Sequence, residues 1–461
     1  MRIVAIIVTL VCCILMFGVK RQTKAAIFIM GAMTLTLVNV PFVPLHKANN
    51  LFPVMFLLSE WNYLEHHFKV FWRTPSLRNP ILVVTFSALV CAWTSPHLNE
   101  SFSEALLFLR GELLLKYFAI CYAFWAYSSE TSIKQTLRVS VYCLIVLTFF
   151  GILNYMKESA VFVNAVTEGR TSIIRSHEGE ALGDFYIGSE RFRVLSMFKS
   201  AFDYGYICSA IFLLHLHCFI QRIEKKQTFL IAAFCCLFGV YFCGCRTVWV
   251  AFVISLCCYF FWCFKLKKTS LWFLIAVMAF ILSYGVVPFI EEKVDLVSDI
   301  FSDDPLTKGS SLMMRQKQLE ATMDNLDEED ELTGQGKGYF IKDMVYGNNQ
   351  VVDKNLYGME SVILSYILER GFLGLALWAL FYVLLFIYFK MHRQRYKRLT
   401  GLGVSFLLLY VFFSVGTGEL GSVYPTMLLF GFVIKAIEYD KTKMNRLSIM
   451  NEKTCDCYTS L

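Results

Sequence analysis

The chain has 461 residues, of which 57% are hydrophobic and only 17% are charged, and its formal net charge is +7. A soluble domain of this length needs more charged side chains on its surface, so the composition excludes a soluble globular enzyme. The apolar residues fall in runs of about 17 to 25, the helix length that crosses a bilayer core. Because a backbone in lipid must satisfy its own hydrogen bonds, these runs predict an all-α, polytopic bundle of transmembrane helices.

Twelve or thirteen spans are predicted, depending on whether a short third run that contains Pro53 is counted. In chain order they are approximately 3–19, 25–44, 50–60, 80–95, 105–127, 138–156, 194–220, 228–244, 247–264, 271–290, 359–389, 401–417 and 423–437. They divide the chain into N-terminal helices (1–156), a first long loop (157–193), central helices (194–290), a large loop (291–358), C-terminal helices (359–437) and a tail (438–461). The first run is followed by Lys20 and Arg21 without a small-residue cleavage site, so we expect it to remain as a helix.

Lysine and arginine gather in alternate short links, which predicts that these links are cytoplasmic. The basic links are Lys20–Lys24, Lys134–Arg138, Arg222–Lys226, Lys265–Lys268, Lys390–Arg398 and the tail after Lys435. The two long loops would then face outward, with the N-terminus outside and the C-terminus inside. Since this pattern is the ordinary signal of membrane topology, we expect no nucleic-acid partner.

The large loop is expected to contain an amphipathic helix. Ser310 and Ser311 can cap a helix from Leu312 to about Leu326, with apolar side chains along one face that would lie in the plane of the interface. Those side chains are Leu312, Leu319, Met323 and Leu326. After it, Asp327–Glu331 reads as a solvated turn, and Gly334, Gly336 and Gly338 predict a tight loop.

The sixteen cysteines do not indicate a disulfide framework, because nearly all lie inside apolar runs, where they pack as small side chains. Cys455 and Cys457 form a lone pair in the tail, without further ligands nearby. We therefore expect neither a metal nor a cofactor.

Four arginines lie in outward segments, where topology does not require positive charge. They are Arg191 and Arg193 before the seventh span, Arg246 in the turn after the eighth, and Arg315 in the loop helix. The planar guanidinium binds phosphate or pyrophosphate through two hydrogen bonds, which suits a lipid-linked pyrophosphate at the outer membrane edge. The alternative is that each arginine extends to lipid headgroups.

Glu360 begins the eleventh span directly after the large loop, where a carboxylate can act as a general base beside an arginine-held leaving group. Alternatively, it only favours the helix dipole. Other ionisable residues have structural readings. Lys199 and Asp203, four residues apart, can neutralise each other, and Glu369 can pair with Arg370. His215 and His217 lie near the inner end of their span, and we expect no catalytic role for them.

Four motifs, in this order, resemble those of the O-antigen polymerase and O-antigen ligase superfamily of bacterial envelopes. The first is Arg193 followed by a span that begins with Met197 to Gly205, and the second is the turn Cys245-Arg246-Thr247. The third is Ser311 and Arg315 near the start of the large loop, which closes with glycines 334, 336 and 338. The fourth is Glu360-Ser361, followed by the segment 368–374. The resemblance covers about residues 190–390.

The resemblance implies a metal-independent glycosyltransferase at the periplasmic face of the inner membrane. Its donor and acceptor would be glycans on undecaprenyl pyrophosphate, and a chain-length regulator is a further candidate partner. Arg246 and Arg315 would act as catalytic residues, together with Glu360, whose role as the base is a hypothesis from its position alone. Arg191, Arg193, Lys199, Gly336 and Gly338 would bind the pyrophosphate or substrate.

Polymerase is favoured over ligase, because the ligase branch has a His-Asn or His-Ser pair where this chain has Glu360-Ser361. The segment Glu291–Tyr357 also contains no histidine. A flippase or other secondary transporter is a further alternative, since arginines can grip a lipid phosphate. A transporter of this kind would place ionisable residues near the bilayer midplane.

Overall fold

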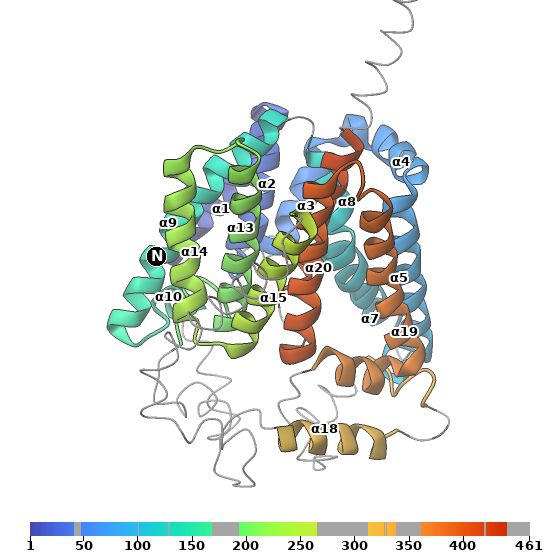
Figure 1. Cartoon of the computed structure of the whole chain (residues 1–461). Helices are drawn as coiled ribbons and strands as arrows, with labels where there is room; N and C mark the ends of the chain where they lie inside the picture. Colours follow the sequence, from blue (N-terminus) through green and yellow to red (C-terminus); the bar gives the residue numbers. More distant parts are fainter. Residues whose placement is uncertain are drawn as a thin grey trace, which may run out of the picture.

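The computed structural model describes residues 1–40, 48–99, 101–127, 130–167, 193–264, 312–326, 328, 330–337, 361–418 and 421–439. Within these ranges the chain is helical and contains no β-strand, and most helices stand side by side as a bundle (Figure 1). The predicted all-α polytopic bundle is confirmed. Outside the described residues lie several predicted features: Arg191, the span 271–290, Lys265–Lys268, Ser310 and Ser311, Gly338, Glu360, and the tail with Cys455 and Cys457.

The N-terminal half of the chain forms α1 (Arg2–Gly18), α2 (Arg21–Thr34), α3 (Ala48–Ser59), α4 (Leu64–Arg73), α5 (Pro75–Thr94), α6 (Pro96–Asn99), α7 (Phe102–Leu109), α8 (Ala119–Ala126), α9 (Glu130–Lys157) and α10 (Val161–Thr167). A short 3-10 turn, η1 (Trp61–Tyr63), precedes α4, and a π-helix, η2 (Arg110–Tyr117), joins α7 to α8. The C-terminal half forms α13 (Ala201–Ile220), α14 (Lys226–Phe242), α15 (Arg246–Cys263), α18 (Leu312–Asp324), α19 (Val362–Met391), α20 (Lys397–Thr417) and a last helix, 423–439.

Six of the described helices are long and apolar enough to cross a membrane, and three shorter apolar helices accompany them. The six are Pro75–Thr94, Thr131–Lys157, Ala201–Ile220, Arg246–Cys263, Val362–Met391 and Lys397–Thr417. The predicted span over 105–127 is not one regular α-helix, because α7, the π-helix η2 and α8 follow one another along it. The π-helix there carries ionisable side chains in place of a uniform apolar surface: Glu112 is buried, and residues 110 and 116 are half-buried.

Several boundaries follow from residues with clear local preferences. Pro75 stands at the first position of α5, where its missing N–H costs no helical hydrogen bond. The Ser200 hydroxyl accepts a hydrogen bond from the Asp203 N–H at 3.1 Å and so caps α13. Gly418, at φ 78°, ends α20 in the left-handed region that glycine tolerates best.

The described basic links meet at one end of the bundle, here called the basic end. Arg21 donates a hydrogen bond to the Trp125 carbonyl at 3.2 Å, and Arg398 donates one to the Gln221 side chain at 3.0 Å. Buried hydrogen bonds at this end join His215 to Ser140 and to Glu224, both at 2.8 Å. These contacts are consistent with the predicted grouping of the links on one side of a membrane.

The opposite end carries the outward segments and is called the loop end here; α18 lies there across the bundle axis (Figure 1). The predicted loop helix is therefore present, and mostly small or polar side chains form the face that packs against the protein. Leu319 and Met323 are exposed, whereas Gln318, Ala321 and Thr322 are buried. Side chains of this kind can face the protein: Ala321 is small, and the Thr322 hydroxyl donates a hydrogen bond to the Gln318 carbonyl.

Candidate functional site

Three predicted arginines gather at the loop end, around the last turn of α20. Arg315, on α18, donates a hydrogen bond to the Gly416 carbonyl at 3.0 Å. Gly416 in turn lies against Thr247, because a Cβ added to it would stand 2.7 Å from the Thr247 Cγ2. The large loop and the Arg246-Thr247 turn are thus brought to the same point of the fold, and Arg246 is exposed there.

Arg193 lies beside the same turn from the other direction. Val194 donates a backbone hydrogen bond to the Phe242 carbonyl at 3.1 Å, which ties this segment to the end of α14. The Arg193 side chain passes Gly244 and places its guanidinium carbon 5.8 Å from the centre of the Phe202 ring. We call Arg193, Arg246 and Arg315 the arginine cluster.

Asp203 reaches the same region from the first turn of α13. Its Oδ1 accepts a hydrogen bond from the Gly421 N–H at 3.0 Å, in the turn that follows α20. The expected ion pair between Lys199 and Asp203 is absent among the described contacts, because the backbone after α20 holds the carboxylate and Lys199 extends into solvent.

The predicted base and two predicted binding residues, Glu360, Arg191 and Gly338, lie outside the described residues. The chain resumes at Ser361, whose backbone nitrogen would be 4.0 Å from a Cβ on Gly418. The described chain therefore re-enters the bundle beside the turn that Arg315 and Asp203 contact.

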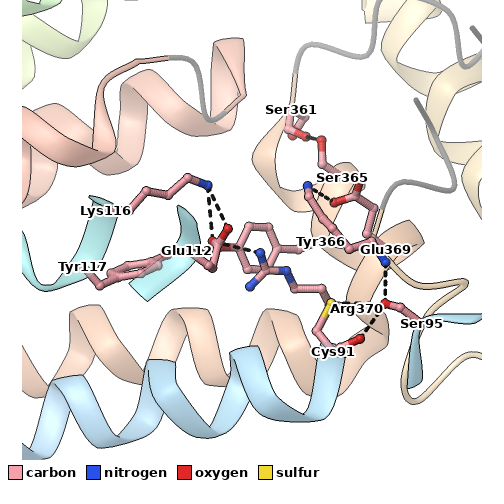
Figure 2. Close-up of polar contacts among 11 residues, drawn as sticks. Cys91, Ser95, Glu112, Lys116, Tyr117, Ser361, Ser365, Tyr366, Glu369 and Arg370 are labelled. Atoms are coloured by element: carbon pink, nitrogen blue, oxygen red, sulfur yellow. Dashed lines mark hydrogen bonds and ion pairs between the residues drawn. The ribbon is translucent and has the colours of Figure 1, made fainter. Parts of the chain in front are cut away.

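A second polar group lies deeper and is shown in Figure 2. Glu112 accepts a hydrogen bond from Arg370 at 2.9 Å and from Lys116 at 3.1 Å, and Lys337 pairs with Glu369. We call Glu112, Lys116, Lys337, Glu369 and Arg370 the ion-pair cluster. The Glu112 and Arg370 side chains are only 4% and 5% exposed, so each needs the other to offset the loss of water.

Two irregular helices position this cluster. The π-helix η2 presents Glu112 and Lys116 to one side, and its last residue, Tyr117, shares a hydrogen bond with the Tyr366 hydroxyl at 3.1 Å. Helix α19 is broken at Gly371, at φ 62°, directly after Arg370. The guanidinium of Arg370 stacks 4.5 Å from the Tyr366 ring centre.

The loop segment 330–337 fills the break in α19 through its backbone. The N–H groups of Gln335 and Gly336 donate to the carbonyls of Leu368 and Glu369, and those of Phe372 and Leu373 donate to Glu331 and Leu332. Gly334 and Gly336 have φ 75° and 93°, which confirms the tight loop predicted there. A Cβ on Gly334 would lie 2.4 Å from the Arg370 nitrogen, so glycine is required for this approach.

Sequence reasoning missed Glu112, Lys116 and Lys337, and it paired Glu369 with Arg370. That pairing is wrong: the break after Arg370 sends the two side chains to different partners. The sequence contained a signal for Glu112 and Lys116, because burying a charged residue inside a membrane span costs free energy and usually marks a polar interior. Within the described ranges, no group of three or more His, Cys, Asp or Glu side chains is close enough to hold a metal ion.

The apolar helices, the basic links at one end and the arginine cluster at the other define a multi-pass membrane protein. A family model described as O-antigen ligase matches residues 231–379, so this part of the chain is similar to the proteins of that family. The match includes Arg246, Arg315 and Gly336 and leaves Arg193 and Lys199 outside. Among curated proteins no sequence matches the chain. The family that this model describes consists of glycan-processing enzymes.

Proposed function

We propose that this protein polymerises oligosaccharide repeat units carried on undecaprenyl pyrophosphate. The observation that carries the proposal is the placing of three arginines at one end of the bundle: Arg315 contacts the last turn of α20, Arg246 adjoins Thr247, which packs on the same turn, and Arg193 passes Gly244. Among the described residues, neither Arg193 nor Arg315 forms an ion pair with a carboxylate, so their charge is available to a ligand. Two or three guanidinium groups at one point suit a diphosphate better than a neutral sugar.

In the proposed reaction, the arginine cluster holds the diphosphate of the donor, with Arg191 and Lys199 adding charge around it. Glu360 takes the proton of an acceptor hydroxyl, and the resulting oxygen attacks the anomeric carbon of the donor glycan. The bond from that carbon to the diphosphate oxygen breaks, and the arginines stabilise the negative charge on the leaving diphosphate. The step needs no oxidant, reductant or metal.

The ion-pair cluster has a supporting role in this proposal. It fixes the break of α19, and the break holds the segment that contains Gly336 and Lys337. Gln335 also donates a hydrogen bond to the Asn325 carbonyl at the end of α18, at 3.1 Å. The buried charges therefore position α18, and with it Arg315, over the end of α20.

The ligase function is the second candidate, because the matching family model is described as O-antigen ligase. The two functions differ in the acceptor: another lipid-linked repeat unit for a polymerase, and the lipid A core for a ligase. Glu360-Ser361, in place of the ligase pair with histidine, favours the polymerase.

A deletion strain complemented with variants tests the proposal on a polysaccharide gel. Loss of a polymerase leaves single repeat units on the lipid core, loss of a ligase leaves bare core, and loss of a flippase leaves lipid-linked units on the cytoplasmic side. We expect Arg246→Ala and Arg315→Ala to abolish the ladder and leave single units. Lys317→Ala, an exposed cation on the same helix as Arg315, should leave the ladder intact.

Two further results would contradict parts of the proposal. If Glu360→Gln keeps full polymerising activity while Arg246→Ala loses it, Glu360 is not the base. If cysteine labelling places positions 246 and 315 on the cytosolic side, the donor is across the bilayer and the proposal fails.

A further inference from the structure

A second charged site lies at the basic end, about a bundle length from the arginine cluster. It is a cavity of about 160 Å³ between four segments that are distant in sequence. Its polar lining comes from Arg21 at the start of α2, His66 and His67 on α4, and Lys435 on the last helix, and Phe124 and Trp125 of α8 form an aromatic wall. We call it the basic-end pocket.

The lining residues carry positive charge and include no carboxylate. Arg21 donates to the Trp125 carbonyl, and its side chain remains 41% exposed. The ammonium group of Lys435 lies 4.6 Å from the centre of the Phe124 ring. The contact with Phe124 orients Lys435 without neutralising it. Arg21 shares the Glu60 carboxylate with two other partners, so it is neutralised only in part.

Glu60, in the link after α3, is the carboxylate behind the pocket. Its oxygens lie 2.7 Å from the Lys24 ammonium, 3.3 Å from His67 Nε2 and 3.5 Å from Arg21 Nη2. Burial raises the pKa of Glu60, but hydrogen bonds from His67 and Lys24 and the charge of Arg21 outweigh it and lower the pKa to about 2. One ionised carboxylate is thus shared by three partners, and positive charge remains in excess.

The surroundings of the pocket are those of a membrane interface. The segment of η1 and α4 exposes large aromatic side chains, with Trp61 67%, Tyr63 55% and Trp72 55% accessible. Tryptophan and tyrosine concentrate at the level of lipid headgroups, where one part of the ring is apolar and the other polar. Tyr63 also packs 5.6 Å from the Arg21 guanidinium, which places the pocket at this level.

We propose that the basic-end pocket binds the phosphate group of an anionic phospholipid, with Arg21 and Lys435 as its direct partners. Basic pockets between helices at a membrane surface are suited to such headgroups. The bound lipid would connect α2 and α4 to the last helix and so hold the two ends of the chain together. The site is separate from the glycan-transfer site, and neither proposal depends on the other.

The test compares purified full-length protein in nanodiscs of phosphatidylcholine alone and of phosphatidylcholine mixed with phosphatidylglycerol. The readouts are the Tm and the number of phosphatidylglycerol molecules retained in native mass spectrometry. The variants are Arg21→Gln, Lys435→Gln and the double variant. Lys69→Gln is the matched control, since it removes an exposed cation of α4 that pairs with Glu65 outside the pocket.

We expect phosphatidylglycerol to raise the Tm of the natural protein and of Lys69→Gln, and to have no effect on the double variant. Each single variant should bind the lipid about fivefold more weakly, the usual contribution of one cation near an anionic surface. If the double variant fails to fold, the lipid retention and the Tm shift of the two single variants test the proposal instead.

Two outcomes would overturn the proposal. One is a double variant that retains the same lipid-dependent Tm shift as Lys69→Gln. The other is an equal shift from inorganic phosphate in phosphatidylcholine nanodiscs, which would identify a free anion as the ligand.

Discussion

The two charged clusters near the loop end use similar side chains in opposite ways. In the ion-pair cluster, Arg370 is buried and bound to Glu112, and Lys337 is bound to Glu369. In the arginine cluster, Arg315 contacts a backbone carbonyl and Arg193 an aromatic ring. Charge that the protein neutralises itself holds structure together, whereas charge left without a carboxylate is available for a substrate. Removing charge from the first cluster should therefore affect stability, and from the second, activity.

The largest effect is expected for Arg370→Met. This change leaves Glu112 buried with only Lys116 beside it, and breaking one side of a buried pair typically costs about 3–5 kcal/mol. The Tm in detergent should fall strongly, and the double variant with Glu112→Met should recover most of the loss, because two apolar side chains need no partner. An unchanged Tm for the single variant would refute the structural role of this pair.

Gly334→Ala should have the next largest effect. A methyl group there would stand 2.4 Å from the Arg370 nitrogen, and the φ of 75° is itself strained for alanine, so we expect a cost of about 1–3 kcal/mol. Gly18→Ala is the control, since nothing lies within 4 Å of a Cβ at Gly18. Thermal unfolding measures both. Equal stability of the two variants would show that the segment does not fill the break of α19.

Arg315→Lys tests the arginine cluster without removing its charge. A lysine cannot form two parallel hydrogen bonds with a diphosphate, so polymer formation should fall roughly tenfold or more while the Tm changes little. The rate of chain growth on lipid-linked repeat units is the measurement. Full activity of this variant would mean that charge alone, without the planar fork, is sufficient.

The smallest effect is expected for Ser200→Ala, which removes the cap of α13 near the arginine cluster. Loss of such a cap costs about 1 kcal/mol, and Ser200→Asn should restore most of it, because an asparagine oxygen accepts the same Asp203 N–H. A destabilisation of Ser200→Asn as large as that of Ser200→Ala would point to another role for Ser200.

Local sequence patterns predicted much of this fold because the membrane imposes simple rules. Long apolar runs form helices, and the described basic links, such as those with Arg21 and Arg398, lie at one end of the bundle. The glycines at 334 and 336 took up the positive φ values that their spacing suggested. These features depend on neighbouring residues, which a sequence displays directly.

The partners of charged residues could not be predicted in the same way. Glu112 and Arg370 are far apart in sequence, and they meet only because α19 breaks at Gly371 and η2 widens its turn. The inward face of α18 was equally unpredictable from the sequence, because Leu319 and Met323 are exposed whereas Gln318 and Thr322 are buried. The gathering of the arginines was expected from topology alone, but the meeting point at Gly416 came from the three-dimensional packing.

The wide turn of η2 makes this stretch intolerant of changes in length. A helix advances by about 100° per residue, so deleting one residue between Arg110 and Tyr117 would let the turn tighten to α and shift side chains within the turn by up to about that angle. The glutamate would then point away from the guanidinium of Arg370. Sequences that share this fold should therefore keep the same number of residues between α7 and α8, as well as the paired residues at 112 and 116.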